Sequence, residues 1–183
     1  MRFLIVVMFL LTGCASQTPG FIVAPQLFWP QSTALQQSQF AFNVTDSRGQ
    51  PYTLRLQKDG KVQHIHAAND IRAQLQNVLS QTLIDQGAVI SPDSSTTMTV
   101  RINQLQSIVE QRTLEHSVTN LIALTVYIES PSGTFNKSYS GDSSYTAPFK
   151  MDVAAVEREL RVLTEQVLTQ LMQDSSWQSA LRG

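Results

Sequence analysis

The alternation of apolar and polar residues between positions 97 and 145 restricts the fold more than any other part of the sequence. Apolar side chains alternate with polar ones over residues 98–102 and again over residues 122–128. A period of two is typical of a strand that buries one face. Turn residues at 131–133 separate the second run from a third extended segment, 135–145. The sequence therefore predicts a meander of three long strands.

Shorter strands and two amphipathic helices complete the pattern. Four further extended segments are expected at 40–44, 52–56, 62–67 and 88–90. Apolar residues at helical spacing predict one helix from residue 71, capped by Asn69 or Asp70 and stopped by Gly87, and another from residue 151 to 173. Because each helix has one apolar stripe, we expect an α+β two-layer sandwich, with two long helices packed on one face of a mainly antiparallel four- to five-stranded sheet.

The first 13 residues have the layout of a secretory signal peptide. A single positive charge at Arg2 precedes an apolar run over residues 3–11, which is shorter than the roughly 20 residues of a transmembrane helix. The next residues resemble the lipobox of bacterial lipoproteins: Leu11, Thr12, Gly13 and Cys14. The resemblance implies that residues 1–13 are removed and that Cys14 carries acyl chains that anchor the protein to a membrane. The alternative is a free or buried cysteine in an ordinary signal-peptide flank.

The residues after Cys14 predict the destination and the organisation of the mature chain. Ala15 and Ser16, rather than an aspartate, follow the cysteine. By resemblance to other lipoproteins, this implies sorting to the outer membrane, on its periplasmic face. Residues 14–39 are expected to form the lipidated N-terminus and a partly docked tether, and residues 40–183 a single α+β domain. Trp29 in the tether has three interpretations: packing on the domain, lying at the bilayer interface, or meeting a partner.

Several stretches of the mature chain together resemble the YajG family of uncharacterised bacterial lipoproteins. Besides the lipobox, they are FIVAPQL (21–27), FNVTDSR (42–48), DIRAQLQNVLSQTLIDQG (70–87), and the hairpin segments MTVRINQLQSIVEQ (98–111) and VTNLIALTVYIES (118–130). The resemblance covers nearly the whole mature chain and implies an envelope location. The order of strands and helices is also similar to that of periplasmic accessory lipoproteins of the LptE and ABC-transport-auxiliary type, but fold does not fix function.

The charge and the motifs exclude several classes of partner. The chain has 13 basic and 14 acidic residues, a net charge of −1, and no cluster of lysine and arginine, so we expect no nucleic-acid partner. No glycine-rich phosphate loop or other cofactor signature is present, so no cofactor is expected.

The histidines are the first candidates for a metal site. His64 and His66 lie two residues apart on a possible strand and could chelate a metal together. The mature chain offers no cysteine besides the lipidated one, and a third ligand would have to come from afar. We therefore expect structural or surface roles for both, and for His116 as well.

Catalytic patterns are weak. The serine-rich stretch at 140–144 contains no Gly-x-Ser-x-Gly elbow, and we expect it to be a bulge or a loop. Glu110, Glu115 and Glu129 could form the carboxylate pair of a glycan hydrolase only if two of them lay about 5–10 Å apart across a cleft. We expect them instead to keep the hairpin soluble.

Asp46 and Arg48 are the remaining candidates for binding, together with Trp29. At positions i and i+2 of an extended segment, the two charged residues lie on one side and either recognise a partner or form a local ion pair.

These patterns predict a non-catalytic binding or accessory module, attached to the membrane through acyl chains on Cys14, whose partner is an envelope protein, a lipid or a glycan. The alternatives are a hydrolase acting on cell-wall or lipid material and a purely structural spacer. The outer face of the sheet bears on this choice: an apolar patch of Leu121, Ala123 and Tyr127, if exposed, would favour a protein or lipid partner.

Overall fold

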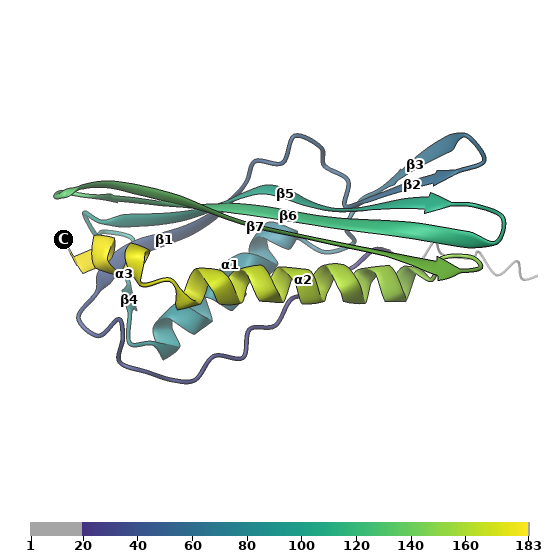
Figure 1. Cartoon of the computed structure of the whole chain (residues 1–183). Helices are drawn as coiled ribbons and strands as arrows, with labels where there is room; N and C mark the ends of the chain where they lie inside the picture. Colours follow the sequence, from purple (N-terminus) through teal and green to yellow (C-terminus); the bar gives the residue numbers. More distant parts are fainter. Residues whose placement is uncertain (1–19, 183) are drawn as a thin grey trace, which may run out of the picture.

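A strongly curled, seven-stranded mixed sheet dominates the fold (Figure 1). The computed structural model describes residues 20–182, so the predicted signal peptide and the predicted lipobox lie outside the described part. Its strands are β1 (Gln39–Asp46), β2 (Leu54–Lys58), β3 (Lys61–Ile65), β4 (Val89–Ile90), β5 (Thr97–Gln111), β6 (Glu115–Ser130) and β7 (Gly133–Pro148). Its helices are α1 (Ile71–Asp85), α2 (Val153–Gln173) and α3 (Ser175–Arg182).

Strand β5 organises the sheet because it pairs with three strands. One edge pairs antiparallel with β6 along nearly its whole length, and β6 pairs with β7 in the same way. The other edge is shared: β1 pairs in parallel with residues 97–102, and β2 pairs in parallel with residues 107–111. Strand β4 extends the sheet beyond β1, and β3 extends it beyond β2.

A bulge in β5 lies at the point where its shared edge changes partner. The register with β6 shifts between Ile102 and Gln104, which leaves Asn103 as the extra residue. Before the bulge even-numbered residues such as Ile102 point into the core, and after it odd-numbered residues such as Leu105 do so. The bulge explains why the alternation in the sequence becomes irregular after residue 102.

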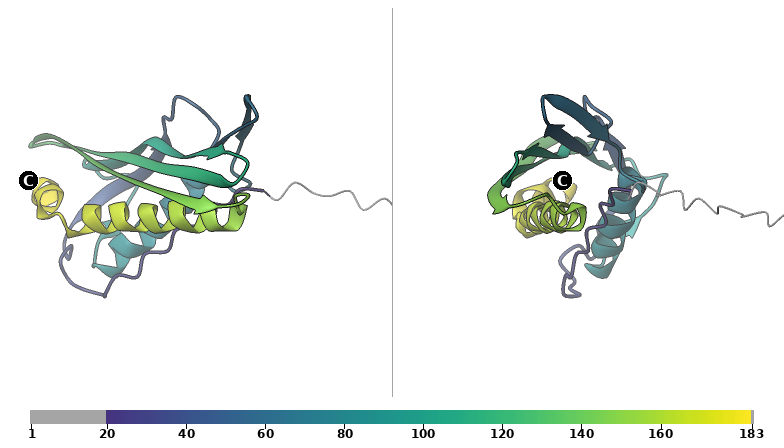
Figure 2. Two further views of the ribbon diagram at one scale, coloured as in Figure 1. Left: turned by 45° about the vertical axis from the view of Figure 1, so that its right-hand side comes forward. Right: turned by 90° about the vertical axis from the view of Figure 1, so that its right-hand side faces the viewer.

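The prediction of two long helices on one face of a mainly antiparallel four- to five-stranded sheet is wrong. The sheet has seven strands and three parallel pairings, and three helices lie on its concave side (Figures 1 and 2). The error has a physical cause: a period of two reports which face of a strand is buried, not which strand it pairs with or in which direction. The parallel pairs join segments far apart in the sequence, which alternation does not connect.

The helix boundaries follow their caps. Asp70 accepts a hydrogen bond from the Ala73 amide over 2.9 Å, and Asp152 accepts one from Ala154 over 3.0 Å, so each aspartate satisfies a free amide of the first turn. Gly87 follows α1 with φ of 90°, which confirms its role as a left-handed stop. Asn69 does not cap α1; its side chain pairs with the backbone of Val23 instead.

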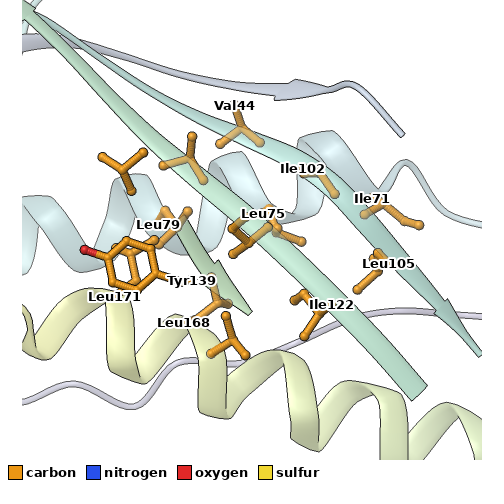
Figure 3. Close-up of a cluster of buried hydrophobic side chains, with 14 of the residues drawn as sticks. Val44, Ile71, Leu75, Leu79, Ile102, Leu105, Ile122, Tyr139, Leu168 and Leu171 are labelled. Carbon is orange, nitrogen blue, oxygen red and sulfur yellow. The ribbon is translucent and has the colours of Figure 1, made fainter. Parts of the chain in front are cut away.

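The core lies between the concave face of the sheet and the helices. Figure 3 shows Val44, Ile102 and Ile122 of the sheet facing Leu75 of α1 and Leu168 of α2. The N-terminal segment also contributes, because Phe21, Val23 and Leu35 are fully buried. Much of what the sequence suggested as a tether is therefore packed on the domain.

The expected bulge or loop at residues 140–144 is a second error, since this stretch lies in the middle of β7. Gly141 is there because α2 crosses β7 closely: a Cβ atom at this position would lie 2.9 Å from Cγ2 of Val167 and 3.1 Å from Cδ1 of Leu163. The glycine reflects helix packing, not a turn. None of the helices within residues 20–182 is long and apolar enough to cross a membrane.

Candidate functional site

A cleft of about 590 Å³ lies where the end of β7 meets the start of α2. Tyr145 and Ala147 of β7 form one wall, and Ala155 of α2 faces them, while Lys150 and Glu159 stand among the charged residues that line it. An apolar wall with a few convergent polar groups is the usual character of a ligand-binding site. We call this hollow the β7–α2 cleft.

Tyr145 provides an unused hydrogen-bonding group in this cleft. Its hydroxyl is buried and has no hydrogen-bond partner among the described residues. Burial raises the pKa of the Tyr145 phenol, and the negative charge of Glu159 adds to the rise. The hydroxyl therefore stays protonated at neutral pH. Burial of this unpartnered group costs free energy.

His116 also lines the cleft and is held by its neighbours. The side chain is only 6% exposed, and its ring packs edge-on against Tyr145 with centroids 6.2 Å apart. Nδ1 lies 3.1 Å from the carbonyl oxygen of Phe149. Because a carbonyl only accepts, Nδ1 carries the hydrogen. The predicted structural role of His116 is thus specific: it fixes the loop that leads into α2.

Ser143, which also lines the cleft, belongs to a different network. Ser143 accepts a hydrogen bond from the side-chain amide of Asn120 over 3.2 Å, and Asn120 accepts one from Ser107 over 2.6 Å. These three polar residues satisfy one another on the concave face of β5, β6 and β7. No hydrogen bond joins Ser143 to His116 in the described part of the chain, so this geometry does not activate the serine as a nucleophile.

Arg48 lies at the second hollow of interest, the gap where β5 changes partner from β1 to β2. The hollow measures about 240 Å³ and is lined by Arg48, Tyr52 and Asn103 among others. Arg48 forms an ion pair with Asp46 at 2.7 Å and donates hydrogen bonds to Thr53 and to the carbonyl of Leu105. With its side chain only 10% exposed, Arg48 bridges the gap in the sheet.

The same contacts with Arg48 keep the carboxyl group of Asp46 ionised. Burial raises the pKa of the Asp46 carboxyl, but the hydrogen bonds and positive charge of Arg48 outweigh this effect and hold the pKa below its usual value. The pair is therefore an ionised brace, with the guanidinium largely internal and the carboxylate partly exposed. Its guanidinium is committed to this chain's own oxygens.

A family model and the curated relatives point to the same family. A family model described as an uncharacterized lipoprotein matches residues 25–182. The chain belongs to the YajG lipoprotein family. The uncharacterized lipoprotein YajG of Escherichia coli K12 is 23% identical over 180 residues, covering 95% of this chain and 92% of the relative, and the same protein of Escherichia coli O6:H1 matches equally.

A solved structure supports the fold of this YajG-family chain. The crystal structure of protein XCC0632 from Xanthomonas campestris superposes with a TM-score of 0.53 at 19% identity. It covers 84% of this chain and 94% of that protein. As a lipoprotein family, YajG proteins are associated with the cell envelope.

The other sequence-predicted residues of this YajG-family lipoprotein are dispersed. His64 stacks on Tyr52 with ring centroids 4.1 Å apart, and His66 is exposed just beyond β3. Within residues 20–182, no three His, Cys, Asp or Glu side chains gather closely enough to hold a metal ion. Trp29 is half-buried and packs against the core, which corresponds to the first of its three interpretations.

The three glutamates do not face one another across a cleft. Glu110 and Glu115 flank Arg112 at 4.0 and 3.2 Å in the exposed β5–β6 loop, whereas Glu129 lies at the other end of β6. Glu129 lies fourteen positions beyond Glu115 on β6, a distance of roughly 45 Å. Glu129 is therefore too far away to form the carboxylate pair of a glycan hydrolase with Glu115, and Glu110 and Glu115 are both engaged by Arg112.

The outer face of the sheet presents no exposed apolar patch at the expected place. Leu121, Ala123 and Tyr127 are half-buried. The guanidinium of Arg101 lies 4.5 Å from the centre of the Tyr127 ring and covers it. Two of the exposed apolar residues, Leu114 and Phe149, lie together at the end of the sheet. The sequence interpretation missed them because single apolar residues in loops give no periodic signal.

Proposed function

We propose that this protein is a non-catalytic, lipid-anchored module of the bacterial envelope that binds another envelope component through the β7–α2 cleft. In this proposal Cys14 is acylated, and the domain faces the periplasm from the outer membrane. The observation that carries the binding role is the cleft itself, where an apolar wall that includes Tyr145 and Ala147 stands among charged side chains. Membership of a lipoprotein family supports the anchor.

The chemistry of the cleft supports binding rather than turnover. Its histidine donates to the carbonyl of Phe149, and Ser143 is engaged by Asn120. Arg158 and Glu159 form an ion pair at 3.1 Å. A ligand with an apolar portion and a hydrogen-bond acceptor fits this lining.

The anchor is tested by growing cells with an alkyne analogue of palmitate. We expect the wild-type protein to be labelled and the Cys14→Ser variant to remain unlabelled with residues 1–13 attached. Separation of inner and outer membranes then tests the location, and recovery in the inner membrane would contradict the outer-membrane assignment.

The binding role is tested by photo-crosslinking in cells. A crosslinking amino acid at Ala155 lies in the cleft, and the same amino acid at Gln166, exposed on α2, is the matched control. We expect a discrete adduct at 155 and none at 166. A steady turnover of cell-wall or lipid material by the purified acylated protein would instead favour the hydrolase.

A further inference from the structure

Leu114 and Phe149 form an exposed apolar pair at one end of the domain. Their side chains are 75% and 73% exposed. The Phe149 amide donates to the Leu114 carbonyl over 2.7 Å, which joins the β5–β6 loop to the β7–α2 loop. Both loops lie at the end of the molecule where α2 begins (Figure 1). We call Leu114 and Phe149 the apolar tip.

The backbone of Phe149 is held in an unfavourable conformation to present this tip. Its φ of 66° lies in the left-handed region, where a bulky L-residue is a rare outlier. The carbonyl of Phe149 accepts hydrogen bonds from Nε2 of Gln111 at 3.2 Å and Nδ1 of His116 at 3.1 Å. Gln111 also accepts from the Met151 amide over 2.8 Å. Strain retained by surrounding structure is characteristic of functional positions.

A cationic hollow adjoins the tip. Lys58, Arg112 and Lys150 line a hollow of about 310 Å³ that contains one carboxylate, Asp59. Arg112 is paired with Glu115 and Glu110, but the ion pairs of the described residues do not include Lys58 or Lys150. The two lysines are therefore available to an anionic group from outside.

The start of the described chain lies at the same end. The Ile22 amide donates to Glu157, near the start of α2, over 2.7 Å. Gly20 is the sixth residue after Cys14, and a chain of six residues spans at most about 20 Å when fully extended. The β6–β7 hairpin, by contrast, lies a full strand length away, roughly 50 Å for 16 residues. An anchor at Cys14 therefore brings the apolar tip, not the hairpin, to the bilayer.

We propose that the apolar tip inserts into the headgroup region of the bilayer that holds the Cys14 acyl chains, and that the cationic hollow binds anionic phospholipid headgroups. This inference rests on the proposed lipidation of Cys14. Apolar side chains flanked by lysines are the usual composition of an interfacial membrane contact. The tip thus orients the domain, with the β7–α2 cleft close to the membrane surface.

The experiment uses the full acylated protein in vesicles of phosphatidylethanolamine and phosphatidylglycerol. Cys14 is the only cysteine in the sequence, and acylation consumes its thiol, so an introduced cysteine carries the only free thiol. An environment-sensitive fluorophore is placed by Thr113→Cys beside the tip, or by Ser132→Cys at the far hairpin. Nitroxide-labelled lipids then report proximity to the bilayer.

We expect nitroxide quenching at 113 to exceed that at 132 by at least about threefold, since the two sites lie roughly 50 Å apart along β6. Phe149→Asn in the Thr113→Cys background removes the ring, and asparagine tolerates the left-handed backbone. In this variant, most of the difference in quenching between positions 113 and 132 should disappear. Val89→Asn, which removes another exposed apolar side chain far from the tip, should leave it unchanged.

Three results would overturn the inference in distinguishable ways. If the protein floats with the vesicles but 113 is quenched no more than 132, the anchor stands and the tip does not insert. If Phe149→Asn leaves quenching at 113 unchanged, the short connection to Cys14 alone brings this end to the bilayer. If the purified chain carries no acyl group and does not float, the proposed anchor and the inference fail together.

Discussion

Asp174, at the junction of α2 and α3, holds the C-terminal helix against the sheet through four interactions. Its side chain is 16% exposed and forms an ion pair with Lys137 of β7. It accepts hydrogen bonds from the Tyr139 hydroxyl at 2.7 Å and from the amide and hydroxyl of Ser176 at 2.9 and 2.7 Å. Trp177 directly follows Ser176 and is fully buried, so its position depends on this junction.

The ionised form of Asp174 is the one that these contacts stabilise. The hydrogen bond from Lys137, assisted by those from Ser176 and Tyr139, outweighs burial and holds the pKa of the carboxyl well below its usual range. Because the folded-state pKa is depressed, its stabilisation is complete above the unfolded-state pKa of about 3.9. The stabilisation is then lost as the pH falls further toward the folded-state pKa.

We expect Asp174→Asn to lower the free energy of unfolding by about 2 kcal/mol at pH 7, since hydrogen bonds to a charged group are worth about 1.5–3 kcal/mol. Asp174→Ala should cost about 1 kcal/mol more, because it also removes the capping oxygen of α3. As the pH falls below about 3.9 the gap between Asp174→Asn and the parent should narrow, because Asp174 of the unfolded parent then takes up a proton while the folded parent still holds the charge.

The assay is urea unfolding followed by the fluorescence of Trp177, with Trp29→Phe in all variants so that one tryptophan reports. Asp93→Asn, in an exposed turn, is the matched control and should change stability by less than about 0.5 kcal/mol. The reasoning is refuted if Asp174→Asn behaves like this control at pH 7, or if its deficit is the same at pH 3 as at pH 7.

Three further substitutions test the packing and the two hollows. Gly141→Ala should lower the free energy of unfolding by about 1–3 kcal/mol, because the added Cβ would press on α2. The control Gly49→Ala should be nearly neutral in the same urea titration, because a Cβ there has no neighbouring atom within 4 Å. Arg48→Ala should lower the free energy of unfolding by about 1–3 kcal/mol, because it leaves buried acceptors unpaired. The exposed control Arg72→Ala should lower it by less than about 1 kcal/mol. Equal losses for the two variants would show that the contacts of Arg48 do not stabilise the fold. Tyr145→Phe removes no hydrogen bond, so thermal unfolding should be unchanged or slightly higher, while the crosslink from position 155 should weaken.

Local patterns were enough to predict where the elements lie. Asp70 and Asp152 cap the helices, and Gly87 ends the first, because capping depends on residues a few positions apart. The three long strands were visible from their alternation. The parallel pairing of β1 and β2 with one edge of β5 was not, since it depends on the bulge at Asn103 and on contacts between distant segments.

The candidate site was less predictable because its components are remote in sequence and individually ordinary. Tyr145 and Ala155 come from different elements, and the sequence does not reveal that a tyrosine hydroxyl will be buried without a partner. Arg48 was visible as half of a charged pair, but its commitment to Thr53 and Leu105 depends on the gap in the sheet. The opposite charges of Asp46 and Arg48 identified them as a candidate pair, but only the strand order showed that they bridge a gap in the sheet.

His116 shows how the fold connects the proposed binding site with the proposed membrane contact. Its ring packs against Tyr145 in the β7–α2 cleft, and its Nδ1 holds the carbonyl of Phe149 at the apolar tip. Lys150 likewise lines both the cleft and the cationic hollow. A change in the backbone of Phe149 would therefore alter the hydrogen bond that positions the histidine, and with it a wall of the cleft. Because the two sites share Lys150 and are joined through His116, a bilayer that seated the tip as proposed would lie next to the proposed binding cleft.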